Sequence, residues 1–201
     1  DDGSAAQPAV NYKPTANVHL YAKYDHTYRF PATDEISYYQ GFLGGPSVNQ
    51  FFNPNLKPET SDNYEVGGDY RKDRWSAGAS VYCLTTQDEI FYNTTTYLNE
   101  NLAETRRIGA QFNAGYDAGF AAVRSRIDYV DAQLIKSTSG SGLISDGPLR
   151  MTPALRTTTT GTVRPSKGVA VSLTHRFIGS SFVDDSYASN SPGRVAGINL
   201  F

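Results

Sequence analysis

The chain has 201 residues and a formal net charge of −2 without a basic run, so it can form one sizeable domain and gives no reason to expect a nucleic-acid partner. Aromatic residues make up 12% of the chain, which excludes a disordered segment because disordered chains are poor in them. The single cysteine, Cys83, excludes an internal disulfide framework. No apolar run approaches the roughly 20 residues of a spanning helix, and residues 1–7 show no signal peptide.

The dominant pattern is an alternation of apolar and polar residues with a period of two, which is typical of strands with one apolar face. From residue 17 to residue 30 the even positions are mostly apolar and the odd positions mostly polar. The alternation recurs along the chain and predicts about nine strands. In chain order they are one strand before Tyr12, the segments 17–30, 63–71, 75–83, 108–116, 122–134, 155–164 and 169–178, and a strand that starts near Val195.

Short and long connections alternate between these strands. Tight links are predicted at 13–16, 71–74, 117–120 and 165–168, and long ones at 31–62, 93–105, 136–152 and 179–194. An up-and-down barrel in the bacterial outer membrane has short turns at its periplasmic end and long loops at its extracellular end. A soluble sandwich has no reason to sort its loops in this way.

Aromatic residues flank the tight links and predict a girdle at the membrane interface. They are Tyr12, Tyr70, Trp75, Tyr116 and Phe120. The predicted fold is therefore all-β: an antiparallel up-and-down transmembrane β-barrel, in the bacterial cell outer membrane and surrounded by its lipid. Bacterial single-chain barrels have even numbers of strands, so about nine strands indicate an incomplete fragment.

One segment carries a specific motif. The run NPNLKPETS at residues 53–61 is followed by NYEVG at residues 63–67. It resembles the N-P-x-L-K-P-E-x-S motif of TonB-dependent outer-membrane receptors, which ends an extracellular loop and leads into a descending strand. The positions that carry the resemblance are Asn53, Pro54, Leu56, Lys57, Pro58, Glu59, Ser61, Tyr64, Glu65 and Gly67.

Weaker pieces of the same family pattern follow in the same order, at residues 28–35, 87–90, 101–112 and 148–153. Gln111 stands where the family has an acid, and Ala154 and Leu155 replace an Arg-His pair. The resemblance covers essentially the whole chain and implies a late part of a plugged barrel of about 22 strands. We therefore expect residues 1–201 to be a partial receptor barrel, with the plug domain, the TonB box and the final strands absent from it.

The resemblance implies a receptor and transporter rather than an enzyme. Its cargo would be a scarce nutrient, most often a ferric siderophore, with cobalamin or an oligosaccharide as alternatives, and the TonB complex would energise uptake through the plug. Two other classes stay open. A barrel enzyme would need Asp, His or Ser clustered at the strand tops, and a soluble all-β binding module would need apolar rows richer in Leu, Ile and Val than these.

Candidate cargo-binding residues lie in the first long connection and in the polar row that leads into it. Their aromatic rings could stack on a catecholate or a sugar, or could pack the loop against its neighbours. They are Arg29, Asp25, Tyr38, Tyr39, Phe42, Phe51 and Phe52.

A second set of charged residues is predicted to line the barrel interior, either as a network that faces the plug or as a water-filled polar surface. These residues are Glu65, Arg71, Arg107, Arg124, Arg126 and Asp128. His19 and His26 differ in parity and cannot share a metal ion. The acidic pairs 88–89 and 184–185 are interpreted as solvated loop charge, so the sequence predicts no metal site and no cofactor.

Overall fold

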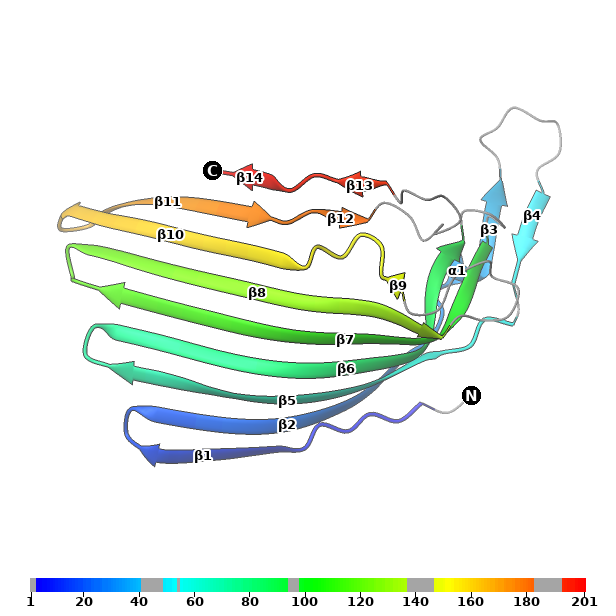
Figure 1. Ribbon diagram of the computed structural model, residues 1–201, viewed down its shortest axis with the longest axis horizontal. Coiled ribbons are helices and arrows are strands. Elements are labelled where there is room, and N and C mark those ends of the chain that lie inside the picture. Colours follow the sequence, from blue (N-terminus) through cyan, green and yellow to red (C-terminus); the bar gives the residue numbers. More distant parts are fainter. Residues whose placement is uncertain (1–2, 41–48, 54, 94–97, 137–146, 183–192) are drawn as a thin grey trace.

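The computed structural model describes residues 3–40, 49–53, 55–93, 98–136, 147–182 and 193–201. Its main feature is one antiparallel sheet whose principal strands follow one another from edge to edge in chain order (Figure 1). These strands are β1 (Ala9–Thr15), β2 (Val18–Arg29), β5 (Glu59–Lys72), β6 (Trp75–Asn93), β7 (Leu98–Asp117), β8 (Ala121–Lys136), β10 (Leu155–Ser166), β11 (Val169–Ile178) and β14 (Ile198–Leu200). The all-β antiparallel prediction is confirmed.

Smaller elements lie at the long-loop end of the sheet, on the right in Figure 1. They are helix α1 (Thr33–Ile36), the hairpin of β3 (Ser37–Gln40) and β4 (Asn49–Phe52), strand β9 (Gly147–Pro148), and the pair of β12 (Ser181–Phe182) and β13 (Arg194–Val195). No helix in the described part of the chain is long and apolar enough to cross a membrane.

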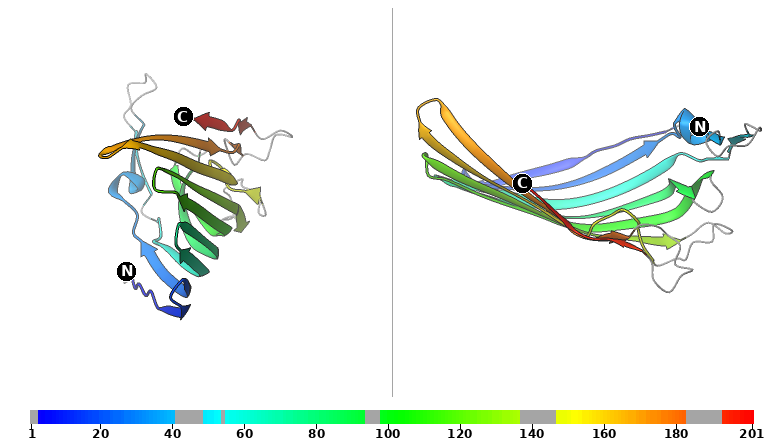
Figure 2. Two further views of the ribbon diagram at one scale, coloured as in Figure 1. Left: turned by 90° about the vertical axis from the view of Figure 1, so that its left-hand side faces the viewer. Right: turned by 90° about the horizontal axis from the view of Figure 1, so that it is seen from above.

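The sheet is curled but open, with β1 and β14 at its two edges (Figure 2). An exposed edge strand leaves a row of backbone hydrogen-bonding groups without partners. Backbone polar groups in lipid must be paired, so a sheet of this kind reaches its membrane-spanning form only as part of a closed barrel.

Strand register collects the apolar rows on one face of the sheet. Directly paired residues form a continuous apolar row across seven strands, namely Val10, Ala22, Val66, Val81, Ala110, Tyr129 and Leu155. Val66 and Val81 are each 54% exposed, and most large apolar residues on this face are similarly open. Because an exposed apolar surface of this extent is stable only against lipid or a protein partner, the pattern is that of a barrel exterior.

The apolar face has polar or aromatic borders at both ends. The predicted girdle lies at the short turns, where the rings of Trp75 and Tyr116 are in contact, tilted by 48° with centroids 4.5 Å apart. At the other end a polar row crosses the same face through the paired residues His26, Asp62, Thr85, Arg106 and Gln133. From Trp75 to Thr85 the strand rises about 33 Å, which at a tilt of about 40° gives the roughly 25 Å of an outer-membrane apolar band.

The four predicted tight links are present, and three of them place a residue in the left-handed region: Asp73 (φ 53°), Gly119 (φ 89°) and Gly168 (φ 83°). One predicted long connection is wrong. Residues 98–105 belong to β7 rather than to a loop, since β6 runs to Asn93 and β7 begins at Leu98. Pairing between the two strands continues above the apolar band to Asn93 and Leu98, and this backbone pairing does not need the alternation of an apolar face.

Candidate functional site

The long-loop end of the sheet ties its loop segments to the strands through one arginine. Arg29, the last residue of β2, donates two hydrogen bonds to the Glu59 carboxylate at the start of β5, of 2.7 and 2.9 Å. Its third nitrogen donates to both oxygens of Glu35 in α1, at 2.7 and 2.9 Å. The planar guanidinium can serve two carboxylates in this way because its donors form a fixed fork.

Both carboxylates also accept from the backbone. Glu35 accepts from the amide of Ala32, which caps the first turn of α1, and Glu59 accepts from the amide of Ile90 on β6 at 2.7 Å. The hydrogen bonds from Arg29 are the main cause that holds the pKa of Glu35 below its ordinary value, and the Ala32 amide adds to the effect. Arg29 therefore joins β2, α1, β5 and, through Glu59, β6.

Three asparagines extend this network. The Asn53 side chain donates to the carbonyl of Asn99 at 2.9 Å, and the Asn99 side chain donates to the carbonyl of Glu35 at 2.9 Å. Asn101 accepts from the amide of Lys57 and donates to the carbonyls of Lys57 and Asp88. We call this set the loop-anchor network, and its members are Arg29, Glu35, Asn53, Glu59, Asn99 and Asn101.

An ion pair stands beside the network. Arg107 on β7 binds both oxygens of Glu89 on β6, at 2.6 and 2.9 Å, and the fully buried hydroxyl of Thr105 donates to the same carboxylate. Burial raises the pKa of Glu89, but the hydrogen bond and charge of Arg107 outweigh it and the net pKa is lowered. The interpretation of Glu89 as solvated loop charge is wrong, because β6 continues past Asp88, whose φ of 53° lies in the left-handed region.

Buried apolar side chains gather in one cluster at this end. Leu102, Ala132 and Leu134 pack with Leu149, which follows β9 and donates its amide to the carbonyl of Ala132. The Arg150 guanidinium lies 5.6 Å above the Phe91 ring at the edge of the cluster. The loop around β9 is thus fixed to β7 and β8 mainly by apolar burial, in contrast to the polar attachment of α1 and β4.

Lower on the polar face, the motif glutamate is fully engaged. Glu65 accepts from the hydroxyl of Tyr21 at 2.7 Å and pairs with Lys23 at 3.0 Å. The Tyr21 ring lies across the strand at Gly67, where an added Cβ would sit 2.6 Å from the ring. This close approach is the physical reason for a glycine at that motif position.

The candidate cargo-binding residues fall into two groups. Arg29 and Asp25 lie on the polar face as expected, and Asp25 accepts from Asn63 at 3.1 Å and lies 3.5 Å from Lys23. The four aromatics Tyr38, Tyr39, Phe51 and Phe52 lie in the β3–β4 hairpin, where Tyr38 pairs with Phe51. Phe42 and the motif residue Pro54 lie outside the described residues. Cargo binding by this set stays a prediction.

The sequence did not indicate Glu35, Asn99 and Asn101 as network residues, and Glu89 was taken for solvated loop charge although it is bound by Arg107. Asn99 and Asn101 lie in a segment that was expected to be a loop. Their spacing of two residues puts both side chains on one face of a strand, and this spacing was the only sequence signal that could have indicated them. The interior set is placed as expected: Arg126 pairs with Asp128 at 2.9 Å, Arg107 with Glu89, and Arg71 and Arg124 lie near the short turns. In the described part of the chain no group of three His, Cys, Asp or Glu side chains could hold a metal ion.

The chain has an antiparallel sheet, an exposed apolar band on one face and polar residues on the other. These features identify it as a segment of the wall of an outer-membrane β-barrel. The family model for the β-barrel of TonB-dependent receptor-like proteins matches residues 2–201, and the chain belongs to this family. The polar face is therefore the lumen face, the apolar face is the lipid face, and the short-turn end is periplasmic. A comparison with curated proteins finds no match.

Three solved structures with a similar fold are each much longer than this chain. The copper transporter OprC has a TM-score of 0.73 and 22% identity over 100% of this chain and 30% of its own. The ferric-catecholate import receptor Fiu from Escherichia coli K12 has a TM-score of 0.68 and 17% identity, over 96% and 27%. A mutant of the ferric enterobactin receptor PfeA from Pseudomonas aeruginosa, in complex with enterobactin, has a TM-score of 0.70 and 17% identity, over 97% and 31%. The chain thus spans less than a third of these proteins, and the likeness shows the fold.

Proposed function

We propose that the protein containing this chain is a non-enzymatic outer-membrane receptor that imports ferric siderophores with energy supplied through TonB. The observation that carries the proposal is the loop-anchor network, which fixes α1 and the entry to β5 on either side of an aromatic-rich hairpin at the extracellular end. A receptor of this family needs such a fixed platform, because the entropy of ordering a loop at the moment of binding lowers affinity.

The proposed cargo contacts are the hairpin aromatics with Phe42, and the polar row of Arg29 and Asp25 below them. Aromatic rings can stack on catecholate rings, and the chemistry of the hairpin is compatible with such a cargo. Several of the similar structures are described as receptors for iron complexes, which supports this cargo class over cobalamin and oligosaccharides. The TonB complex acts on this wall segment through the plug domain of the same receptor, which we place outside residues 1–201.

The test uses the intact receptor in outer membranes of cells grown with and without iron. We expect iron-repressed abundance and saturable, TonB-dependent uptake of a labelled ferric catecholate. The double variant Tyr38→Ala/Phe51→Ala is expected to lower uptake at least tenfold, whereas Val171→Ala on the lipid face leaves it unchanged. A protein that is present in the outer membrane but takes up labelled copper, cobalamin or oligosaccharide instead would refute the siderophore assignment and keep the receptor class.

A further inference from the structure

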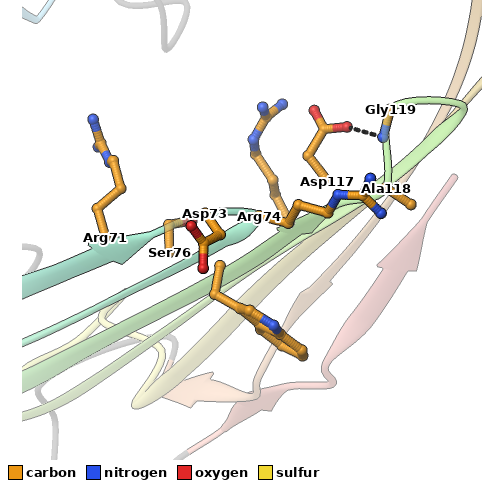
Figure 3. Close-up of a pocket in the computed structure, with 9 residues that line it drawn as sticks. Arg71, Asp73, Arg74, Ser76, Asp117, Ala118 and Gly119 are labelled. Atoms are coloured by element: carbon orange, nitrogen blue, oxygen red, sulfur yellow. Dashed lines mark hydrogen bonds between the residues drawn. The ribbon is translucent and has the colours of Figure 1, made fainter. Parts of the chain in front are cut away.

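Two hollows at opposite ends of the sheet differ in the face on which they open. The hollow at the periplasmic mouth has a volume of about 600 Å³ and is lined by Arg71, Arg74 and Arg124 together with Asp73 and Asp117 (Figure 3). Its charges are of both signs, like those of the rest of the polar lumen face. The other hollow, of about 370 Å³, lies at the long-loop end, and we call it the outer groove.

Strand parity places the outer groove on the outside of the wall. His26, Tyr28 and Phe30 line it, and they continue the even-numbered row that faces lipid lower on β2. Thr60, which also lines it, pairs with Tyr28 and therefore lies on the same face. The outer groove is thus on the opposite side of the wall from Arg29 and from the proposed cargo site.

The outer groove reaches above the lipid headgroups. His26 belongs to the polar row at the upper border of the apolar band. Tyr28 and Phe30 lie two and four residues further along, so at a tilt of about 40° they are about 5 and 10 Å above that border. The headgroup layer of one leaflet is about 5–8 Å thick. A molecule that fills the groove must therefore extend beyond phospholipid headgroups, as the sugars of an outer-leaflet glycolipid do.

The side chains of the outer groove combine aromatic rings with two charged groups. The rings of Tyr28 and Phe30 meet edge to face with centroids 5.2 Å apart, and these residues are 37% and 46% exposed. Such rings can stack on the apolar face of a sugar. Lys57 is only weakly held by Asp88, because the contact is 3.7 Å long and the lysine side chain is 69% exposed. Lys57 can therefore bind an anionic group, and Asp88 can accept hydrogen bonds from sugar hydroxyls.

The backbone that carries these charged groups is fixed before any ligand binds. Asn101 on β7 accepts from the amide of Lys57 at 2.9 Å and donates to the carbonyls of Lys57 and Asp88, at 3.0 and 2.6 Å. A site that is already ordered loses little entropy on binding. The motif lysine is therefore held by its main chain, while its side chain is left for a contact outside the barrel.

We propose that the outer groove binds an anionic sugar of an outer-leaflet glycolipid, at the point where the oligosaccharide leaves the membrane. Tyr28 and Phe30 contact the face of the sugar ring, Lys57 binds its phosphate or carboxylate, and Asp88 accepts from its hydroxyls. The site recognises the sugar and not the acyl chains. It does not rest on the identity of the cargo, which binds on the lumen side.

The test measures binding of a water-soluble probe, so that acyl chains do not contribute. The probe is the labelled, deacylated core oligosaccharide of lipopolysaccharide with its phosphates, added to the intact, delipidated receptor in detergent. We expect saturable binding by fluorescence anisotropy, weakened at least tenfold by Lys57→Glu and by Tyr28→Leu. Neutral maltoheptaose should bind at least tenfold more weakly than the probe, and glycerol phosphate should not compete with it.

The matched control is Lys136→Glu, which should change the affinity less than twofold. The Lys136 side chain is also 69% exposed and is also paired with a carboxylate, that of Glu104. It lies in the same outward row as Tyr28 and Thr60, but three strands away from the groove on β8.

Absence of saturable binding overturns the proposal, as does an affinity that neither groove variant changes. Competition by glycerol phosphate, or equal binding of maltoheptaose, also overturns it, because the ligand would then be a phospholipid headgroup or a neutral sugar. Binding that is lost in Tyr38→Ala/Phe51→Ala but kept in Lys57→Glu would place the sugar in the cargo site instead. If Lys57→Glu does not accumulate, Lys57→Ala replaces it. Because the readout is oligosaccharide binding and not uptake, failure of this site is distinct from failure of the siderophore assignment.

Discussion

The two ends of the lumen face differ in how many of their arginines bind carboxylates of this chain. At the extracellular end Arg29 and Arg107 bind carboxylates of this chain at 2.6 to 2.9 Å. At the periplasmic end Arg164 binds Asp117 at 2.9 and 3.1 Å, whereas Arg71, Arg74 and Arg124 form no ion pair or side-chain hydrogen bond within the described residues. A paired arginine fixes the segment that carries its carboxylate, whereas the exposed arginines Arg71, Arg74 and Arg124 fix no other segment of the described residues.

The largest effect is expected from breaking the most enclosed pair. Glu89→Ala leaves Arg107 without its carboxylate and Thr105 without an acceptor, at a position where the paired side chains are only 22% and 23% exposed. The barrel should lose about 2 kcal/mol, since an uncompensated charge in a partly enclosed site is costly. The measurement is the unfolding midpoint in detergent, and the swapped pair Glu89→Arg/Arg107→Glu should recover part of the loss.

Releasing the loop anchor comes next. In Arg29→Ala the helix α1 and the start of β5 lose their common donor, so added protease should cleave between α1 and β4 about tenfold faster. The comparison predicts no change in that cleavage for Arg71→Ala, at the other end of the lumen face. Equal cleavage in both variants would mean that Arg29 does not hold the loop.

The contacts of Asn101 with the motif residue Lys57 allow a matched pair of variants. Asn101→Ala removes three hydrogen bonds to the backbone around Lys57 and Asp88, and we expect a loss of about 1–2 kcal/mol. Lys57→Ala should cost less than about 0.5 kcal/mol, because its side chain is exposed and its ion pair to Asp88 is 3.7 Å long. If Lys57→Ala is the more harmful variant in thermal unfolding, the motif lysine acts through its charge.

The smallest effect is a pH dependence of the anchor. Glu35 has a folded pKa below its ordinary value near 4.5, so its contribution is complete above that value and is lost as pH falls through the lowered pKa. The protection factor of the α1 amides, which is corrected for the intrinsic pH dependence of amide exchange, should therefore be constant from neutral pH down to about 4.5 and should fall only below it. Glu35→Gln should show weaker protection and no such step, and a step in this variant would assign the titration to another group.

The sequence predicted the strands within the membrane band but not their extension beyond it at the extracellular end. Inside the membrane band, alternation is imposed by lipid on one side and water on the other, and the predicted faces of the strands from 17–30 to 169–178 agree with the register. Above the band both faces meet water, so the alternation disappears and β6 and β7 beyond Thr85 and Arg106 carry no such signal.

The candidate site was predictable only in part for a related reason. Arg29 and Glu59 were found through parity and motif, but their bond to each other depends on register between strands 30 residues apart in the chain. Glu35 and Asn99 join them only because α1 folds back over the strand ends, and no local pattern encodes that contact. Arg71 and Arg124 were predicted as interior residues, and only the structure separates them from paired interior residues such as Arg107.

The unequal strand lengths give the mouth of the barrel an uneven rim. Strand β6 continues from Thr85 to Asn93 beyond the lipid band, which at the same tilt raises the wall by about 20 Å above the headgroups. Two strands further along the sheet, β10 begins only at Leu155, which pairs with Tyr129 on β8, four residues short of the polar row at Gln133. The regular pairing of β10 therefore ends inside the lipid band. Among the described residues, the regular sheet therefore extends well beyond the headgroups at β6 and β7, whereas at β10 it ends below them.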